Sequence, residues 1–189
     1  MSISDSNAIS DTNTLHGGAL IIFLEEISKS NNGIKYSIDF CNTKSKYKFK
    51  FLYENSDHKE RIIGLYIKHS QKRISPWRYT FTRDNQKEIN DLEKDCDKTF
   101  ILLITNQEGI ALLNQDLYKQ LLNKTIDDSE WISISRKHNE NFRIWSKDRP
   151  KKGTLAKNCF PNEIVEYLNI YNIKQKSELK QRLNFFNSR

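Results

Sequence analysis

Aromatic and basic side chains alternate along the stretch Lys44-Ser-Lys-Tyr-Lys-Phe-Lys-Phe-Leu-Tyr53. Successive side chains of a β-strand point to opposite faces of its sheet, so the aromatic rings from Tyr47 to Tyr53 share one face and the lysines from Lys44 to Lys50 share the other. One apolar face and one charged face are typical of an antiparallel sheet that covers a core on one side. The stretch therefore predicts a strand of this kind.

Segments with the patterns of strands and helices surround this stretch. Strand patterns lie at 36–40, 62–68, 100–104, 110–113, 131–135 and 142–145, and the segment 100–104 is wholly apolar, as in the middle of a sheet. Apolar residues at helical spacing predict helices at 18–29, 81–96, 114–122, 161–172 and 177–186. The order predicts an α+β fold, with a mainly antiparallel mixed sheet (a meander plus hairpins) packed by two or three helices, and a C-terminal helical tail.

The chain of 189 residues has the length of one ordinary domain with short appendages. Residues 1–16 are polar and predict a disordered lead-in, and residues 17–148 contain the α+β core. Residues 149–160 have the composition of a basic linker, and residues 161–189 form the helical tail. These boundaries follow from composition and apolar periodicity.

The composition excludes several classes of protein. No apolar run is long enough to cross a bilayer, and the first 15 residues lack the basic and apolar segments of a targeting signal. Three scattered cysteines are typical of reduced thiols, which indicates a cytoplasmic protein. Neither the spacings of zinc ligands nor the glycine-rich loops of nucleotide-binding proteins occur, so we expect no metal and no cofactor.

Charge is segregated along the chain, which has a net charge of +7. Residues 61–83 and 143–157 each contain six basic residues, with no acidic residue in the first segment and one in the second. Residues 84–130 contain eleven acidic and five basic residues, a net of −6. Basic faces favour nucleic acid, either DNA or RNA, whereas the acidic segment favours a protein partner.

The most informative basic segment is 68–83, in which arginines alternate with aromatic residues. Stacking on bases and charge on phosphates are the two contacts that hold a single strand, so we expect Trp77 to stack. The residues expected to bind phosphates are Lys68, Lys72, Arg73, Arg78 and Arg83, with additional affinity from Lys151 and Lys152. The alternative is that Trp77, Tyr79 and Phe81 form the core face of a strand, with Arg78 and Thr80 in solvent.

The lysines of the opening stretch have two interpretations. Their spacing along one strand face, ~6.6–6.8 Å, is close to the phosphate repeat of a nucleic-acid strand. Lysines also protect the edge strands of sheets against aggregation. Both interpretations stay open from the sequence.

The C-terminal segment Lys176-Ser-Glu-Leu-Lys-Gln-Arg-Leu183 resembles the second helix of the SAP motif, a helix-turn-helix found in chromatin and DNA-repair proteins. The connecting loop is short and lacks the glycine of that family. The resemblance implies contact of the DNA backbone by four basic residues, Lys174, Lys176, Lys180 and Arg182. The alternative is a helix whose residues Leu179, Leu183 and Phe186 pack on the sheet.

A third set of residues has the chemistry of a metal-dependent nuclease. Asp39, Glu54 and Lys68 fall on or beside three successive predicted strands, where two carboxylates and a lysine can hold a divalent ion and position water. The compact acid-x-Lys pattern of restriction-type nucleases is missing, because Tyr66 stands two residues before Lys68. Our first hypothesis is therefore a non-enzymatic nucleic-acid-binding module in a larger assembly. The alternatives are an accessory subunit that binds protein and a divergent nuclease.

Overall fold

The computed structural model describes residues 10–29, 34–41, 43, 45–53, 60–122, 128–147, 149 and 153–169. The fold is α+β, as predicted, with four helices and two mostly antiparallel sheets in the described residues. In chain order the elements are α1 (Asp11–Lys29), β1 (Ile34–Phe40), β2 (Lys46–Tyr53), β3 (Glu60–His69), β4 (Trp77–Phe81), α2 (Arg83–Asp95), β5 (Lys98–Ile104), η1 (Asn106–Glu108), β6 (Ile110–Asn114), α3 (Gln115–Leu121), β7 (Glu130–Ser135), β8 (Phe142–Ser146) and β9 (Gly153–Leu155). A helix over 159–169 ends the described chain.

Sheet A has the strand order β1-β2-β3-β5-β6. Neighbouring strands of this sheet are antiparallel, except for β3 and β5, which run parallel to one another. Parallel neighbours need a crossover connection, and here β4 and α2 supply it. The apolar strand predicted at 100–104 is β5, which lies between β3 and β6 and is buried from Thr99 to Ile104.

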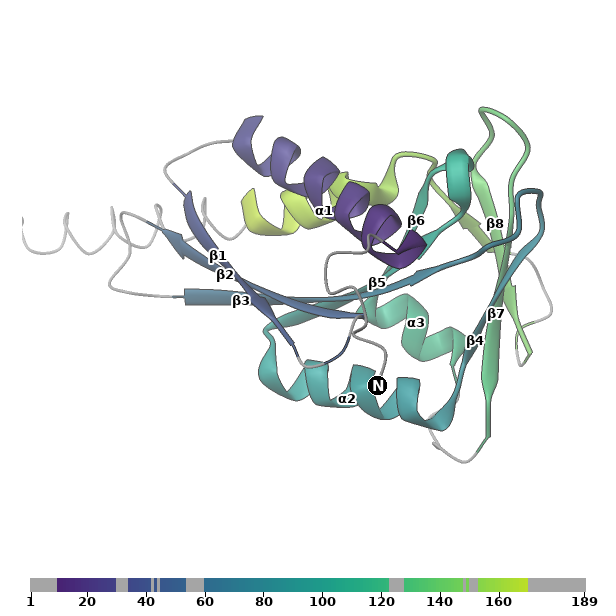
Figure 1. Cartoon of the computed structure of the whole chain (residues 1–189), viewed down its shortest axis with the longest axis horizontal. Helices are drawn as coiled ribbons and strands as arrows, with labels where there is room; N and C mark the ends of the chain where they lie inside the picture. The colour runs from purple at the N-terminus through teal and green to yellow at the C-terminus, as the bar shows by residue number, and fades with distance from the viewer. Residues whose placement is uncertain are drawn as a thin grey trace, which may run out of the picture.

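The first face of sheet A packs against α1 and the C-terminal helix, which lie side by side in Figure 1. Phe49 and Phe51 of β2 are fully buried on this face, as the alternation of the opening stretch predicts. The ring of Phe23 on α1 meets the ring of Phe49 edge-on at 5.1 Å between centroids. The apolar residues predicted for the tail helix, Ile164, Val165 and Leu168, belong to the same core.

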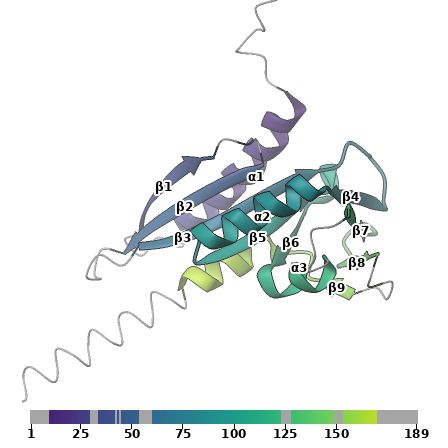
Figure 2. The ribbon, with the colours of Figure 1, turned by 90° about the horizontal axis from the view of Figure 1, so that it is seen from below.

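The second face of sheet A is covered by α2, α3 and a second sheet (Figures 1 and 2). This sheet B has the strand order β4-β7-β8-β9 and is antiparallel throughout. Trp77, Tyr79 and Phe81 of β4 are buried between the sheets, which confirms their interpretation as a core face. The short helix predicted at 114–122 is α3, and the Asn114 side chain caps it by accepting a hydrogen bond from the Leu117 backbone N–H at 3.1 Å.

The structure differs from the sequence predictions in three respects. There are two sheets rather than one, because the loop after β3 sends β4 away from sheet A. Helix α1 begins at Asp11, within the predicted lead-in of residues 1–16, and His16 is buried against the Tyr47 hydroxyl at 3.1 Å. The predicted linker 149–160 contains β9, since Gly153–Leu155 pairs with β8. The predicted helix 177–186 lies outside the described residues.

Candidate nucleic-acid interface

The outward side of sheet B presents a regular set of polar, basic and aromatic residues. Because the core residues alternate with outward ones, the opposite face of each strand is fixed by the residues already buried. We define the outer face of sheet B by the eight residues on this side of its strands, Arg78, Thr80, Trp131, Ser133, Ser135, Arg143, Trp145 and Thr154, of which Ser133 is buried. Figure 1 shows the labelled helices on the other side of this sheet.

Strand register arranges these residues in rows across the sheet. Arg78 pairs with Ser133, which pairs with Trp145 on its other side. In the next row along β7, Thr80 pairs with Trp131. On the opposite side of the Ser133 row, Ser135 pairs with Arg143, which pairs with Thr154. The two tryptophans are therefore diagonal neighbours on one face.

The basic segments that the sequence separates meet on this surface. Arg78 comes from the first basic segment and Arg143 from the second, and both are exposed. They are separated by one strand and by two residues along it, which puts their Cα atoms about 12 Å apart. The Arg78 guanidinium lies over the Trp131 ring, 4.3 Å from its centroid. Cation–π contact of this kind holds both groups in place while leaving them at the surface.

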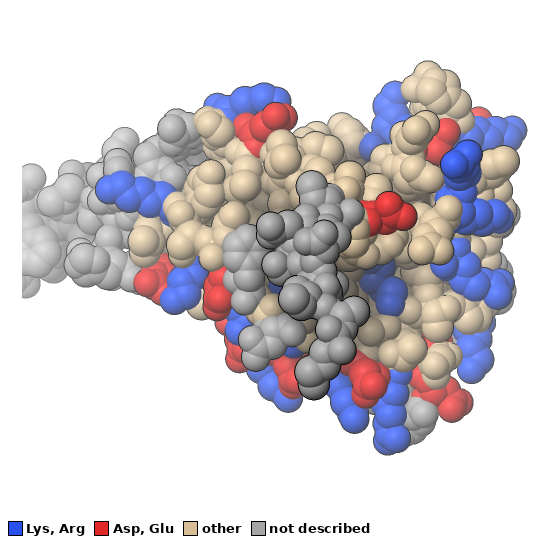
Figure 3. Space-filling model, viewed as in Figure 1, with Lys and Arg blue, Asp and Glu red and all other residues tan. Residues whose placement is uncertain are grey.

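Negative charge is scarce on the outer face. The described strands of sheet B contain one acidic residue, Glu130, which is buried and pairs with Phe81 in the register. The nearest acidic partner of Arg143 is Glu140 in the β7–β8 turn, at 3.6 Å with both side chains about half exposed, so their attraction is weak. In Figure 3 the right-hand edge of the molecule, where Figure 1 places sheet B, is mostly lined by Lys and Arg.

The loop 70–76 extends the basic surface at the start of β4. Its backbone is held by the Trp77 indole, which donates to the Lys72 carbonyl at 2.9 Å, and by the Lys72 ammonium, which donates to the Pro76 carbonyl at 2.8 Å. The Ser75 hydroxyl accepts from the Arg136 backbone N–H at 3.2 Å, which ties the loop to the end of β7. Arg73 is exposed at the tip of this fixed loop.

The predicted phosphate-binding residues have different positions. Lys72, Arg73 and Arg78 are exposed on or beside the outer face, and Arg83 is exposed at the first residue of α2. Trp77 is fully buried, and its indole N–H bonds to the loop, so its ring is not available to stack on a base. We correct the prediction of Trp77 as the stacking residue on this ground. Five residues lie outside the described part of the chain: Lys151, Lys152, Lys176, Lys180 and Arg182.

Lys68 is not part of the outer face. Its ammonium lies 5.1 Å from the centroid of the Phe81 ring and donates to the Asn85 side chain at 2.7 Å, beneath the start of α2. Burial lowers the pKa of Lys68, and the nearby Glu88 carboxylate opposes that effect. The same carboxylate accepts from the Tyr66 hydroxyl at 2.8 Å. Lys68 therefore fixes α2 to the sheet, and we leave it out of the proposed interface.

The nuclease hypothesis requires Asp39 and Lys68 to converge, and the strand register separates them. Asp39 pairs with Lys48, and Lys48 pairs with Gly64 on β3. Lys68 lies four residues beyond Gly64, a displacement of about 13 Å along the strand. Glu54 lies outside the described residues. Among the residues that the structure describes, no group of three or more His, Cys, Asp and Glu side chains is arranged to hold a metal ion.

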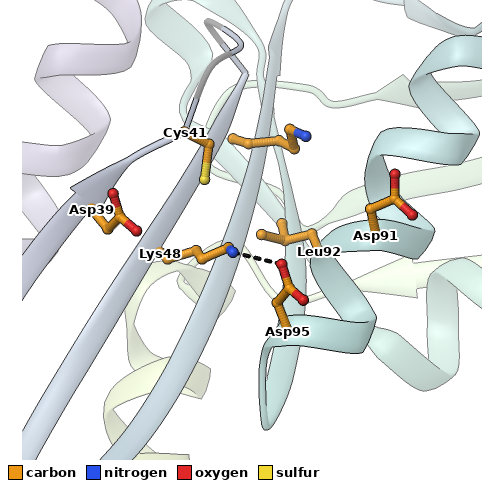
Figure 4. Close-up of a pocket in the computed structure, with 7 residues that line it drawn as sticks. Asp39, Cys41, Lys48, Asp91, Leu92 and Asp95 are labelled. Atoms are coloured by element: carbon orange, nitrogen blue, oxygen red, sulfur yellow. Dashed lines mark hydrogen bonds and ion pairs between the residues drawn. The ribbon is translucent and has the colours of Figure 1, made fainter.

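Asp39 instead lines a small polar pocket between sheet A and α2, with a volume of about 280 Å³. Figure 4 shows Asp39, Cys41 and Lys48 on the sheet side and Asp91, Leu92 and Asp95 on the helix side. The Lys48 ammonium donates to the Asp95 carboxylate at 2.6 Å. This bond raises the pKa of Lys48 and lowers the pKa of Asp95. The lysine and the aspartate neutralise one another here.

Ion pairs of this kind also account for much of the acidic segment 84–130. Its carboxylates pair with lysine and arginine side chains from several elements, and the described pairs are Asp84–Lys87, Asp91–Lys94, Glu93–Lys119, Asp95–Lys48, Asp97–Arg61 and Asp116–Lys98. The acidic segment thus has partners within the fold. Lys48 lies on β2, between β1 and β3, so protection of a sheet edge does not explain the β2 lysines.

Three residues of the candidate interface were not predicted from the sequence, although its pattern contains the signal: Trp131, Trp145 and Arg143. Ile132 and Ile134 alternate with Trp131 and the serines, so burying the isoleucines turns the tryptophan outward. In β8 the buried Phe142 and Ile144 similarly turn Arg143 and Trp145 outward.

Comparison of the chain with models of protein families, with curated protein sequences and with solved structures finds no match. No described helix is both long enough and apolar enough to span a bilayer. The candidate interface is therefore argued from its geometry alone.

Proposed function

We propose that this protein binds nucleic acid through the outer face of sheet B and the adjoining loop 70–76. The observation that carries the proposal is the presence of Arg78 and Arg143, from two basic segments far apart in the sequence, on one sheet face whose strands carry no outward carboxylate. Guanidinium groups bind phosphate oxygens in a bidentate manner, and Lys72 and Arg73 add charge at one end of the face.

The neutral members of the outer face support the same function. Thr80, Ser135 and Thr154 place hydroxyl groups on the same face as the arginines and the tryptophans. The Ser133 hydroxyl is buried and donates to the Trp77 carbonyl at 3.2 Å, so it is not counted with them. Hydroxyl groups bind phosphate and sugar oxygens without selecting a base sequence. The proposed binding is accordingly dominated by the phosphate backbone and should depend steeply on salt.

The alternative of an accessory subunit was based on the unexplained acidic segment. The ion pairs of that segment within the fold remove this argument, although they leave the sequence-based expectation of a larger assembly untested. A protein partner for the basic outer face would itself have to be acidic. The binding experiment separates these possibilities.

The test is fluorescence-polarisation binding of labelled single- and double-stranded DNA and RNA at about 50 and 200 mM salt. Contact with about four phosphates on a single strand predicts a slope near −2.8 for log affinity against log salt, because each contact releases a condensed counterion. A slope of this size supports the proposal. Absence of binding at the lower salt concentration would contradict it and favour an acidic protein partner. Gels of the same samples with magnesium detect any cleavage.

A further inference from the structure

We infer that the outer face of sheet B selects unpaired bases, which stack on Trp131 and Trp145. This inference rests on the proposed function and specifies its ligand as single-stranded nucleic acid. Both indoles belong to the outer face, and both side chains are partly exposed rather than buried. The remaining tryptophan, Trp77, is in the core.

The spacing of the two rings favours separate stacking of two bases. Trp145 pairs with Ser133, and Trp131 lies two residues before Ser133 on the same strand, so the two tryptophans are diagonal neighbours. Diagonal neighbours in an antiparallel pair are about 7–8 Å apart. Successive bases in a stacked strand are ~3.4 Å apart, so two bases that each cover one indole must be unstacked from one another. An unpaired strand can adopt this arrangement, whereas the bases of a duplex are held in their stack.

The charged neighbours of the rings fit a strand that runs across the rows. Arg78 contacts the face of Trp131 and stands in the same row as Trp145. Arg143 lies two residues before Trp145 on β8, on the same face, and belongs to the neighbouring row. The Arg78 guanidinium covers one face of the Trp131 ring, so a base has the other face of that ring to stack on, with the guanidinium beside it for the phosphate. Arg143 is the guanidinium nearest to Trp145 along β8. A guanidinium plane can also stack on a base, as indoles do.

Other surfaces support a ligand less well. The pocket of Asp39, Lys48 and Asp95 has no aromatic ring, and two of these lining residues, Lys48 and Asp95, already form an ion pair with one another. Ile21 and Ile22 are exposed apolar residues of α1, and nothing in the structure indicates what would cover them. The outer face of sheet B, in contrast, has both aromatic rings and positive charges, and the strand register fixes their positions on one sheet.

The experiment compares the wild-type protein with Trp131→Ala, Trp145→Ala and the double variant. The probes are labelled oligothymidylate, a duplex of the same length, and an abasic oligomer with the same number of phosphates. Loss of one stacked base weakens binding by roughly 5- to 150-fold, so each single variant should bind oligothymidylate weaker by a factor in this range. The wild-type protein should prefer oligothymidylate to both the duplex and the abasic oligomer. The double variant should bind oligothymidylate and the abasic oligomer equally.

The control is Tyr36→Ala, which removes a 42% exposed aromatic side chain from sheet A and should leave binding unchanged. A second readout needs no substitution: oligothymidylate should quench the fluorescence of the two partly exposed tryptophans and leave the emission of buried Trp77 unchanged. Wild-type affinity in the double variant, or equal affinity for the duplex, would overturn the inference while leaving the proposed function intact. No binding of any probe by the wild-type protein would overturn both.

Discussion

Replacing Arg78 and Arg143 together by glutamate should weaken single-strand binding by roughly sixtyfold or more at about 50 mM salt. Each phosphate contact on a single strand contributes a factor of about eight at this salt concentration, because affinity varies as salt concentration to the power of about −0.7 for each contact. Two lost contacts therefore give roughly sixtyfold, and the introduced negative charges weaken binding further. The slope of log affinity against log salt should become shallower by about 1.4. Polarisation titrations at several salt concentrations measure both quantities.

A matched control separates this local effect from net charge. Lys29→Glu with Lys94→Glu makes the same change in net charge at two exposed lysines, on α1 and α2. Among the described residues each lysine pairs with a carboxylate of its own helix at the surface, so each reversal should cost about 1 kcal/mol or less and the protein should still fold. We expect the control protein to keep most of the affinity and the original slope. Equal loss of affinity in both double variants would show that total charge, rather than the outer face of sheet B, governs binding.

Replacing Phe49 by alanine should lower the free energy of unfolding by about 3–5 kcal/mol. Phe49 is fully buried, and its ring contacts Phe23 of α1 edge-on and lies 6.3 Å from the ring of Phe51. Removing it leaves a cavity between α1 and sheet A that the fixed strand cannot fill. The loss is a large part of the roughly 5–15 kcal/mol that keeps an ordinary domain folded. Urea unfolding followed by circular dichroism measures it as a lower midpoint.

The comparison variant for this prediction is Lys50→Ala, one residue along the same strand. The Lys50 side chain is 46% exposed and lies 3.9 Å from the Glu60 carboxylate, so its removal should change stability by less than about 0.5 kcal/mol. Similar midpoints for the two variants would contradict the packing of α1 on the aromatic face of β2.

The arrangement of β2 could be predicted because it depends on local alternation alone. The aromatic rings of Phe49 and Phe51 are buried in the core. A shift of the strand register by one residue would expose these rings to water and bury the lysines instead. Helix α2 was predicted in a similar way, because apolar residues at helical spacing are also a local pattern. Local patterns of this kind determine which face of an element is buried.

The division into two sheets could not be predicted from such patterns. Whether β4 joins β3 or leaves it depends on the path of the loop 70–76, which is fixed by contacts such as Trp77 to the Lys72 carbonyl and Ser75 to Arg136. The second of these contacts joins residues 61 positions apart. The strand β9 has three residues, too few for an alternating pattern, and it forms by pairing with the free edge of β8.

The placement of the residues of the candidate interface was predicted in part. Arg78 was expected in solvent if its aromatic neighbours formed a core face, and this is what the structure contains. Trp77 attracted the stacking role because it stands among arginines in the sequence, yet neighbours along a strand point to opposite faces. The ion pair of Lys48 with Asp95 spans 47 positions, so the use of the acidic segment was not visible before the fold.

Photo-crosslinking tests the central claim most directly, because it reports which surface touches the nucleic acid. A single-stranded oligonucleotide with photoreactive uracil bases is bound to the full chain, irradiated and digested with protease, and the crosslinked peptides are identified by mass spectrometry. We expect crosslinks at Trp131 and Trp145, on β7 and β8, and their loss when duplex replaces the single strand. Crosslinks confined to other elements, such as α1 or α2, would contradict the assignment of the outer face of sheet B as the interface.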